Sequence, residues 1–347
     1  MPSSTTPPTP TAIDPALVAG MGAAIEAAAT VRRWTSPNPW VGAALLDAAG
    51  TVIATGATEP PGGRHAEIVA FDAAGDMTEG ATLCTTLEPC CHHGRTPPCT
   101  DRIIAAGVST VVIGVLDPDP LVAGAGVAAL EAAGIEVIVG VEAEAVDQQL
   151  APYLHHRRTG RPWVVAKLAS TLDGATAAAD GTSQWITGPE ARADGHRIRA
   201  ESDAICVGAG TVRADDPSLT VRHTDGRDPR RVVLGAVPAG ALVRPCLEWR
   251  PERDGTLGDL LEQLGDDGVL QLMVEGGAAT LAAFHDADLV DEYVVYLAPA
   301  LLGGAGGTPS LAGTPAASID DLWRGRLGSV DRLGDDVRVV VHPRKDP

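Results

Sequence analysis

Two successive series of alternating strand-like and helix-like segments constrain the fold of this chain more than any other feature. Residues 40–46 and 51–55 flank a D-A-A-G turn, which predicts a β-hairpin at the start of the first series. A second series begins with the extended pattern at 163–169. Because strands that alternate with helices indicate layered α/β structure, we expect a three-layer α/β domain up to about residue 150 and a second α/β domain after it.

The remaining expected elements follow from hydrophobic periodicity and from helix start and stop signals. Expected helices lie at about 14–33, 65–74, 100–107, 127–134, 189–199 and 276–284, and further strands at 81–87, 109–115, 135–140, 203–210, 230–234, 269–275 and 291–299. Asp14 before a proline predicts the cap of the first helix.

The best candidate for a domain boundary is the segment 153–162, Y-L-H-H-R-R-T-G-R-P, which is polar, basic and contains glycine and proline. A chain of 347 residues suits two domains better than one core. We therefore predict one domain over residues 14–152 and another over residues 161–345.

Charge and composition exclude some classes of protein. The 26 basic and 45 acidic residues give a net charge of −19, which disfavours a nucleic-acid partner but allows a small phosphorylated substrate in a local basic pocket. The first fourteen residues lack the features of an export signal, and the apolar run 17–31 is interrupted by Glu26, so we expect no membrane association. We expect a cytoplasmic protein, in which clustered cysteines are metal ligands or catalysts more often than disulfides.

The stretch T-L-E-P-C-C-H-H-G-R-T-P-P-C at 86–99 places three of the six cysteines and two histidines within fourteen residues. Upstream lies His65-Ala66-Glu67. A His-x-Glu followed by Pro-Cys and a second cysteine is the pattern of zinc deaminases, in which the glutamate is not a ligand. Cys90 and Cys91 are too close in sequence to meet one ion easily. The sequence therefore predicts a zinc site formed by His65, Cys90 and Cys99.

Three protein ligands leave one tetrahedral position for water, as in a catalytic zinc site. Zinc would supply hydroxide at neutral pH, and Glu67 would carry the proton from water to the leaving amine. Alternatively, the site is a closed structural one. Its fourth ligand would then be one of Cys84, Cys91, His92 and His93.

The other cysteines and histidines have simpler interpretations. Cys84, Cys206 and Cys246 are expected in the core, and Cys91 is expected to be a small buried residue. If His92 and His93 are not ligands, they lie with Arg95 on a loop beside the metal, where three potential cations suit a phosphate.

Taken together, these motifs resemble the bifunctional deaminase/reductase family of riboflavin biosynthesis. The eight-residue gap between the cysteines and its H-H-G-R-T-P-P filling are specific to that family. P-N-P-W-V-G at 37–42 is similar to its substrate-binding stretch, and K-L-A-S-T-L-D-G, S-Q-W-I-T, R-A-D-D-P-S-L-T-V-R and V-E-G-G are similar to its reductase domain. The resemblance extends from about residue 16 to residue 345. It implies a cytidine-deaminase-like three-layer domain followed by a dihydrofolate-reductase-like α/β domain.

The resemblance also implies the chemistry. Zinc hydroxide would deaminate 2,5-diamino-6-(5-phosphoribosylamino)pyrimidin-4-one, and NADPH would then reduce the ring-opened ribosyl chain to ribityl. The expected cofactors are Zn²⁺ and NADPH, and the expected partners are the small phosphorylated pyrimidine and further copies of this chain in a homo-oligomer.

By the same resemblance, individual residues receive roles. His65, Cys90 and Cys99 hold zinc, and Glu67 is the proton shuttle. The substrate-binding residues are Asn38, His92, Arg95, Ser183, Arg199, Leu219, Arg222 and Glu275, with His92 and Arg95 at the ribose phosphate. The cofactor-binding residues are Ala169, Trp185, Thr211, Asp215 and Gly277.

Simpler interpretations exist for several of these residues. Asn38 suits a turn between two prolines, Arg199 suits a solvated helix face, and the acidic pair at 215–216 suits a turn. Gly276-Gly277 ends a strand and opens a helix, which is consistent with pyrophosphate binding and equally with close packing. No G-x-G-x-x-G follows the first strand of the second domain, so a Rossmann site is not indicated.

Two positions depart from the family pattern. The family commonly has a histidine seven residues before the zinc histidine, where this chain has Thr58, and it often has Asp-Ser where this chain has Gly235-Ala236. These departures put substrate and cofactor contacts there in doubt.

Three rival functions remain at this point. A tRNA or nucleoside deaminase is disfavoured by the charge and by the second domain. A non-catalytic zinc-stabilised binding protein would have no use for Glu67. The third rival is a deaminase whose reductase half has decayed.

Overall fold

The computed structural model describes residues 13–93, 97–304 and 306–344. The chain divides into two compact units, Met1–Leu154 and His155–Pro347. Within the described residues, no helix combines the length and apolar character needed to cross a membrane.

The first unit is built around one five-stranded sheet with the order β2-β1-β3-β4-β5. β1 is antiparallel to β2 and β3, whereas β3, β4 and β5 are parallel to one another. In chain order its elements are α1 (Pro15–Ala29), β1 (Gly42–Leu46), β2 (Val52–Ala57), α2 (Ala66–Ala74), β3 (Thr82–Leu87), α3 (Cys99–Ala105), β4 (Thr110–Val115), α4 (Ala125–Ala132), β5 (Glu136–Val139) and α5 (Ala143–Thr159), whose last residues belong to the second unit.

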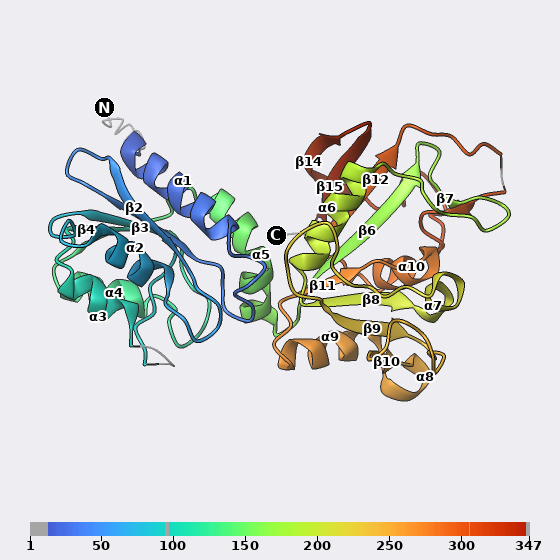
Figure 1. Ribbon diagram of the computed structural model, residues 1–347, viewed down its shortest axis with the longest axis horizontal. Helices are drawn as coiled ribbons and strands as arrows, with labels where there is room; N and C mark the ends of the chain where they lie inside the picture. The colour runs from blue at the N-terminus through green and yellow to red at the C-terminus, as the bar shows by residue number, and fades with distance from the viewer. Residues whose placement is uncertain (1–12, 94–96, 305, 345–347) are drawn as a thin grey trace, which may run out of the picture. The chain divides into compact units, whose positions relative to one another are not determined.

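Two glycines show that helices cover both faces of this sheet. A Cβ atom on Gly42 would collide with the Ala24 carbonyl of α1, and one on Gly56 would collide with the Ala66 carbonyl at the start of α2. Gly56 pairs with Ala43, the residue after Gly42, and successive strand residues point to opposite faces. α1 and α2 therefore lie on opposite faces, as Figure 1 shows. This confirms the three-layer prediction.

The second unit contains an eight-stranded sheet with the order β10-β9-β8-β11-β6-β12-β15-β14, and β7 pairs with β13 in a separate ribbon. The six strands from β10 to β12 are parallel, and β15 and β14 are added antiparallel. Its elements are β6 (Trp163–Thr171), β7 (Ala175–Ala177), α6 (Pro189–Ala200), β8 (Ala204–Gly208), α7 (Ala209–Asp215), β9 (Arg230–Leu234), β10 (Leu247–Trp249), α8 (Pro251–Asp254), α9 (Leu257–Asp266), β11 (Gln271–Val274), α10 (Ala278–Asp286), β12 (Glu292–Ala298), β13 (Thr308–Pro309), β14 (Gly325–Leu333) and β15 (Asp336–Pro343).

Alternate residues of β6 enter two separate cores. Val164 and Ala166 pack with residues of α9 and α10, whereas Val165 packs with residues of α6 and α7. The second sheet is thus also covered on both faces, and the expectation of a second α/β domain is confirmed.

Candidate active sites

The N-terminus of α2 carries two of the predicted deaminase residues. His65 is the residue that caps α2, and Glu67 lies in its first turn. Gly56 allows the start of this helix to approach β2 at backbone contact. The contact with the sheet therefore fixes the position of the first turn of α2, and with it the positions of His65 and Glu67.

Cys90 and Cys99 come from the two ends of the segment that follows β3. Pro98 precedes α3 and Cys99 is its first residue, one residue before the start expected from the sequence. The Cys99 backbone N–H donates to the Cys90 sulfur at 3.3 Å, and the Thr100 N–H donates to the Cys90 carbonyl at 3.2 Å. The first turn of α3 therefore holds Cys90 directly.

The structure brings His65, Cys90 and Cys99 together, with their ligand atoms within 4.8 Å of one another. His65 Nδ1 lies 3.2 Å from the Cys99 sulfur and 3.6 Å from the Cys90 sulfur. Ligands at 2.0–2.3 Å from a tetrahedral zinc ion are separated by roughly 3.5–3.8 Å, so the three atoms need little movement to bind one. Two thiols and one imidazole are also donors that zinc prefers.

The pKa shifts of the two cysteines favour a cation at this cluster. The hydrogen bond from Cys99, opposed by burial and aided by His65, lowers the pKa of Cys90 to about 4. The neighbouring Cys90 and burial raise the pKa of Cys99, because a second thiolate beside the first is unfavourable without a positive ion. A divalent cation removes this conflict.

Glu67 is a buried carboxyl group beside these ligands, with 4% of its surface exposed. Burial and the charge of Cys90 raise its pKa above the usual value. A carboxyl group with a raised pKa holds a proton more readily than an ordinary carboxylate, which suits a group that must both accept and donate a proton in general acid–base catalysis.

No fourth histidine, cysteine or acidic residue in the described part of the chain joins this cluster. The Cys91 thiol donates to the Leu121 carbonyl at 3.9 Å, and His92 and His93 are exposed. Cys84 is buried, and burial raises the pKa of its thiol to about 12. A closed four-ligand site is thus not formed by any of these residues.

The other predicted deaminase residues are less well defined by contacts. Asn38 lies in a turn before β1 and donates its backbone N–H to Thr35 at 2.8 Å. His92 lies outside any helix or strand, and Arg95 lies outside the described residues. Thr58, the first departure from the family pattern, is buried, and its hydroxyl accepts the Val41 N–H at 3.2 Å. Thr58 therefore holds the backbone at Val41, the residue before β1, through this hydrogen bond.

In the second unit, Arg199 and Glu275 form a charged cluster with Lys167, which sequence reasoning missed. Glu275 accepts from Lys167 Nζ at 3.2 Å and from Arg199 Nη2 at 2.6 Å. Burial alone would raise the pKa of Glu275, but the two cations outweigh it and lower that pKa to about 2. A lysine among the apolar residues of an expected strand was the signal that could have identified Lys167.

Arg199 and His196, both on α6, hold the loop that carries Leu219 and Arg222. Arg199 Nη1 donates to the Thr220 carbonyl at 2.7 Å, and the Arg222 N–H donates to His196 Nδ1 at 3.1 Å. Leu219 has a φ of 53°, which is uncommon for a residue with a branched side chain. Backbone strain of this kind persists where neighbouring structure enforces it and is concentrated at functional sites. Arg199 is buried, so the solvated-face interpretation is wrong.

Thr211 and Gly277, both predicted at the cofactor, touch each other. The Gly277 N–H donates to the Thr211 hydroxyl at 3.2 Å. A Cβ on the preceding Gly276 would lie 2.6 Å from the Cβ of Thr280. Close packing therefore explains Gly276, whereas Gly277 is exposed at the N-terminus of α10, where backbone N–H groups favour an anion.

Ser183 and Trp185 line one pocket with Thr171, Ala175 and Leu302. Trp185 is 70% exposed, and the Arg192 guanidinium lies 4.7 Å from its ring centroid. The remaining predicted cofactor residues are spread along this unit: Ala169 is half-buried in β6, and Asp215 is exposed at the end of α7.

The second departure from the family pattern has a structural reason. Gly235 has a φ of 109°, and a Cβ atom there would lie 2.9 Å from the Ala209 side chain at the start of α7. Both the backbone conformation and the close approach favour glycine.

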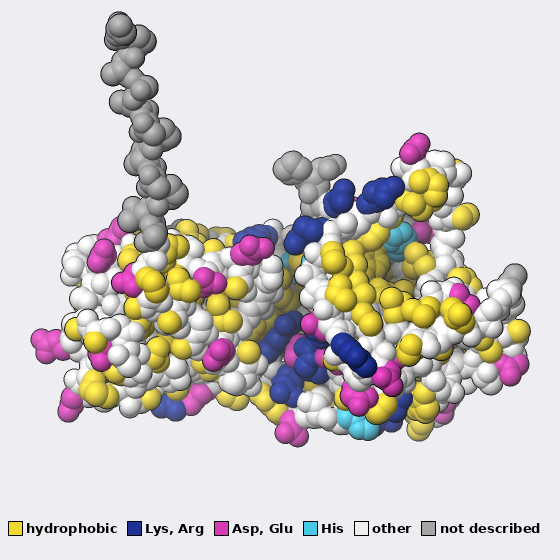
Figure 2. All heavy atoms as spheres, turned by 90° about the horizontal axis from the view of Figure 1, so that it is seen from above, with side chains coloured by type: hydrophobic (Ala, Val, Ile, Leu, Met, Phe, Trp, Pro, Cys, Tyr) yellow, Lys and Arg dark blue, Asp and Glu magenta, His cyan; other side chains and the backbone are white. Residues whose placement is uncertain are grey.

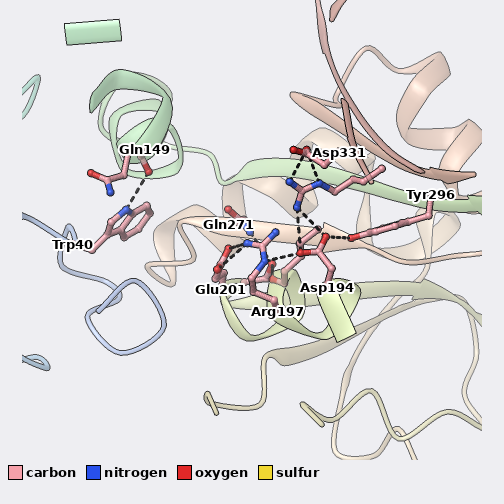
Figure 3. Close-up of polar contacts among 11 residues, drawn as sticks. Trp40, Gln149, Asp194, Arg197, Glu201, Gln271, Tyr296 and Asp331 are labelled. Atoms are coloured by element: carbon pink, nitrogen blue, oxygen red, sulfur yellow. Dashed lines mark hydrogen bonds and ion pairs between the residues drawn. The ribbon is translucent and has the colours of Figure 1, made fainter. Parts of the chain in front are cut away.

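A polar network beside the charged cluster ties α6 to the far end of the sheet, and the sequence did not reveal it. Asp194 accepts from Arg197 at 2.7 Å, from Tyr296 Oη at 2.7 Å and from Arg338 at 3.0 Å, and Arg338 also donates to Asp331 (Figure 3). Lys167 Nζ lies 5.8 Å from the ring centroid of the same tyrosine. The network thereby orients a ring that borders Lys167.

Comparison with known proteins assigns a different family to each of the two units. Residues 17–115 match the cytidine and deoxycytidylate deaminase zinc-binding region, and residues 162–244 and 246–339 match the RibD C-terminal domain. The riboflavin biosynthesis protein RibD of Mycobacterium tuberculosis is 42% identical over 332 residues, covering 93% of this chain and 96% of that protein. The Escherichia coli K12 protein is 38% identical and covers 91% and 96%.

Solved structures agree with these matches. Acinetobacter baumannii RibD superposes with a TM-score of 0.87 at 34% identity, covering 95% of this chain and 99% of that one. A Thermotoga maritima protein described as a diaminohydroxyphosphoribosylaminopyrimidine deaminase and 5-amino-6-(5-phosphoribosylamino)uracil reductase gives 0.84 at 34% identity, covering 94% and 99%.

The fold and the two sites define an enzyme that joins a zinc-binding deaminase to a reductase. The chain belongs to the RibD family. It is a bifunctional deaminase and reductase of riboflavin biosynthesis with zinc and NADPH as cofactors, which confirms the family, fold and cofactors that the sequence motifs implied. Because the matches cover both units, the three rival functions are not supported.

Proposed function

We propose that this chain deaminates 2,5-diamino-6-(5-phosphoribosylamino)pyrimidin-4-one at position two of the pyrimidine and then reduces the ribosyl chain of the product to ribityl. The observation that carries the first step is the cluster of His65, Cys90 and Cys99 with the buried Glu67 in the first turn of the same helix as His65. The Thermotoga maritima relative, whose description names both reactions, supports the substrate.

In this proposal His65 Nδ1 and the sulfurs of Cys90 and Cys99 hold zinc. Zinc, when bound, lowers the pKa of water and so makes hydroxide available near neutral pH. Glu67 would take a proton from the attacking water and give it to the departing amine: a C–O bond forms between the water oxygen and the ring carbon, the C–N bond breaks, and the amine leaves as ammonia. Asn38 orients the pyrimidine, and His92 and Arg95 bind the phosphate.

For the reduction, NADPH would supply a hydride to the ring-opened sugar, and solvent would supply the proton that completes the two-electron reduction. Glu275 stays ionised at neutral pH and keeps the ammonium of Lys167 at a fixed position, 3.2 Å away. Because the Arg199 guanidinium is already engaged by Thr220 and Glu275, we propose that it contributes to substrate binding largely through the loop that presents Leu219 and Arg222. Ser183 completes the substrate set, and Ala169, Trp185, Thr211, Asp215 and Gly277 form the cofactor set.

We assign the deaminase to residues 14–152 and the reductase to residues 161–345. The division of the chain between Leu154 and His155 supports a boundary in this region. All six cysteines are free thiols, which supports a reducing, cytoplasmic environment.

An assay of the purified full-length protein tests the function. The diamino substrate should yield ammonia without NADPH, and NADPH should be oxidised only once the deaminated product is present. If neither ammonia nor NADPH oxidation is detected from a folded, zinc-loaded protein, the proposed substrate is wrong.

Arg199→Ala separates the two activities. We expect it to leave ammonia release unchanged and to lower reductase kcat/KM by about ten- to a hundredfold, since removing the cation leaves the half-buried Glu275 with one of its two cationic partners and frees the Thr220 carbonyl. Both rates would be measured on the same preparation. A comparable loss of ammonia release would contradict the assignment of Arg199 to the reductase alone.

We further propose a homo-oligomer that associates through the second unit. β14 exposes Leu327 and Val330, and Figure 2 shows hydrophobic side chains gathered on one face of this unit. Light scattering should give a multiple of the 35.5 kDa chain mass, and Leu327→Glu should reduce it. A monomer mass at micromolar concentration would contradict the proposal.

A further inference from the structure

Glu88 is a buried carboxylate for which the proposed deamination has no role. It follows β3, lies two residues before Cys90 and is 3% exposed. Its side chain accepts four backbone N–H groups: Oε1 from Gly126 at 2.9 Å and Val127 at 3.2 Å, and Oε2 from Gly124 at 3.0 Å and Asp117 at 3.3 Å. These bonds engage both carboxylate oxygens, so the side chain is bound to the backbone of another segment and does not point into the zinc cluster as a free group.

The four donors all belong to residues 117–127, which connect β4 to the first turn of α4. Gly124 has a φ of 88° and ends the connection in a left-handed conformation, so that its N–H and those of the helix N-terminus converge on one carboxylate. Hydrogen bonds to an ionised acceptor are about twice as strong as neutral ones. Glu88 thus fixes this connection at four points.

The same segment also touches the chain just before Cys90. A Cβ on Gly126 would collide with the Pro89 carbonyl and lie 3.0 Å from Glu88 Oε1. On its other side, Cys90 is held by the N–H groups of Cys99 and Thr100. The backbone that carries the Cys90 sulfur is therefore enclosed between the first turns of α4 and α3.

We propose that Glu88 is a positioning residue of the deaminase site: its carboxylate holds residues 117–127 against Pro89 and thereby fixes the direction in which Cys90 presents its sulfur. Partners of this kind behind a metal ligand typically contribute ten- to a hundredfold to metal affinity. The inference rests on the proposed role of Cys90 as a zinc ligand.

Glu88→Gln tests the inference in the full-length protein. Glutamine keeps the size of the side chain, but its amide NH₂ must face two of the four N–H donors, which then lose their acceptor. We expect zinc to transfer to a chromogenic chelator about ten- to a hundredfold faster than from the wild type. We also expect the visible absorption bands of the Co²⁺-substituted protein to shift, because they report the geometry of the cysteine ligands.

Two further variants keep the test decisive. Gly126→Ala should produce the same two changes without altering any charge, because its Cβ would collide with the Pro89 carbonyl. Alanine favours helix formation, so a loss of helix propensity cannot explain these changes. This variant tests the inference if Glu88→Gln does not accumulate as folded protein. Leu130→Ala, which removes a buried side chain of α4 without touching Glu88, should lower thermal stability but leave the Co²⁺ bands unchanged.

The outcomes separate this inference from the proposed function. Wild-type zinc release and Co²⁺ bands in Glu88→Gln would overturn the inference, as would an equal change in Leu130→Ala. Cys90→Ser should lose zinc whatever the role of Glu88. If Cys90→Ser retains zinc as the wild type does, the proposed ligand set itself is wrong.

Discussion

Glu67→Gln is expected to lower the rate of ammonia release by about 10²–10⁴-fold while the protein keeps its zinc. Glutamine preserves the size of the buried side chain and its capacity for hydrogen bonds, but an amide cannot transfer the proton. Zinc content and ammonia release would be measured on the same sample. Because Glu67 lies in the first unit, NADPH oxidation with the deaminated product should be unchanged.

Cys91→Ser is the matched control for this prediction. Cys91 lies next to a proposed ligand, yet its thiol contacts a backbone carbonyl, so the variant should keep both zinc and deaminase activity. Near-normal deamination by Glu67→Gln would contradict the role of Glu67. A loss of zinc from Cys91→Ser as large as that from Cys90→Ser would instead make Cys91 a ligand and Cys99 the doubtful one.

Removal of zinc from the full-length protein is expected to abolish ammonia release and to leave NADPH oxidation intact. The proposed ligands all lie in the first unit, whereas Lys167, Arg199 and Glu275 lie in the second. Deamination depends on the water that zinc activates, and the reduction needs only a hydride donor and a held substrate. The two rates would be followed after dialysis against a chelator.

Restoring zinc should restore ammonia release to the same preparation, which shows that the treatment did not unfold the first unit. Circular dichroism would establish that the zinc-free protein keeps its secondary structure. A reductase that fails in a zinc-free but folded protein would mean that the two sites are built jointly. The assignment of residues 14–152 and 161–345 to separate activities would then be wrong.

The alternation of strands and helices was sufficient to predict both layered domains, because buried parallel strands leave continuous apolar runs and their crossover helices end at glycines. The local composition was misleading about secondary structure at the domain boundary. Residues 153–159 continue α5, which also contains Pro152, although the polar and basic residues, Gly160 and Pro162 of the segment 153–162 are typical of a connection between domains. Proline lacks only one hydrogen bond there, and buried side chains such as Leu150 and Leu154 compensate.

Two further elements were not predicted, the helix α9 and the hairpin of β14 and β15, although each has a recognisable sequence pattern. Thr256 and Asp259 form a capping box before the apolar positions of α9, and that pattern is visible in T-L-G-D-L-L. The hairpin of β14 and β15 has a turn at Gly334, whose φ is 65°, followed by the mostly β-branched run V-R-V-V-V at 337–341.

The zinc cluster and the reductase cluster differ in how far the sequence could predict them. His65-x-Glu67 and the Pro-Cys pairs are local patterns whose geometry is set by the starts of α2 and α3. Lys167 and Glu275 are 108 residues apart, and Arg199 and Glu275 are 76 apart. Only the pairing of β6 with β11 and the packing of α6 bring such residues together, so the sequence marks Lys167 as unusual but no spacing rule could show that it meets Glu275.

The backbone contact of α1 and α2 with the first sheet determines which sequence changes this enzyme can accept during evolution. At Gly42 and Gly56 any side chain would meet main-chain atoms, which cannot rotate away. Ala24 and Ala70, on the facing helices, are fully buried. Only glycine, alanine and residues of similar size can therefore be accepted where the helices contact the sheet. A change that enlarges a side chain must shift a helix, and shifting α2 also moves the cap of that helix, which is the residue we assign to zinc.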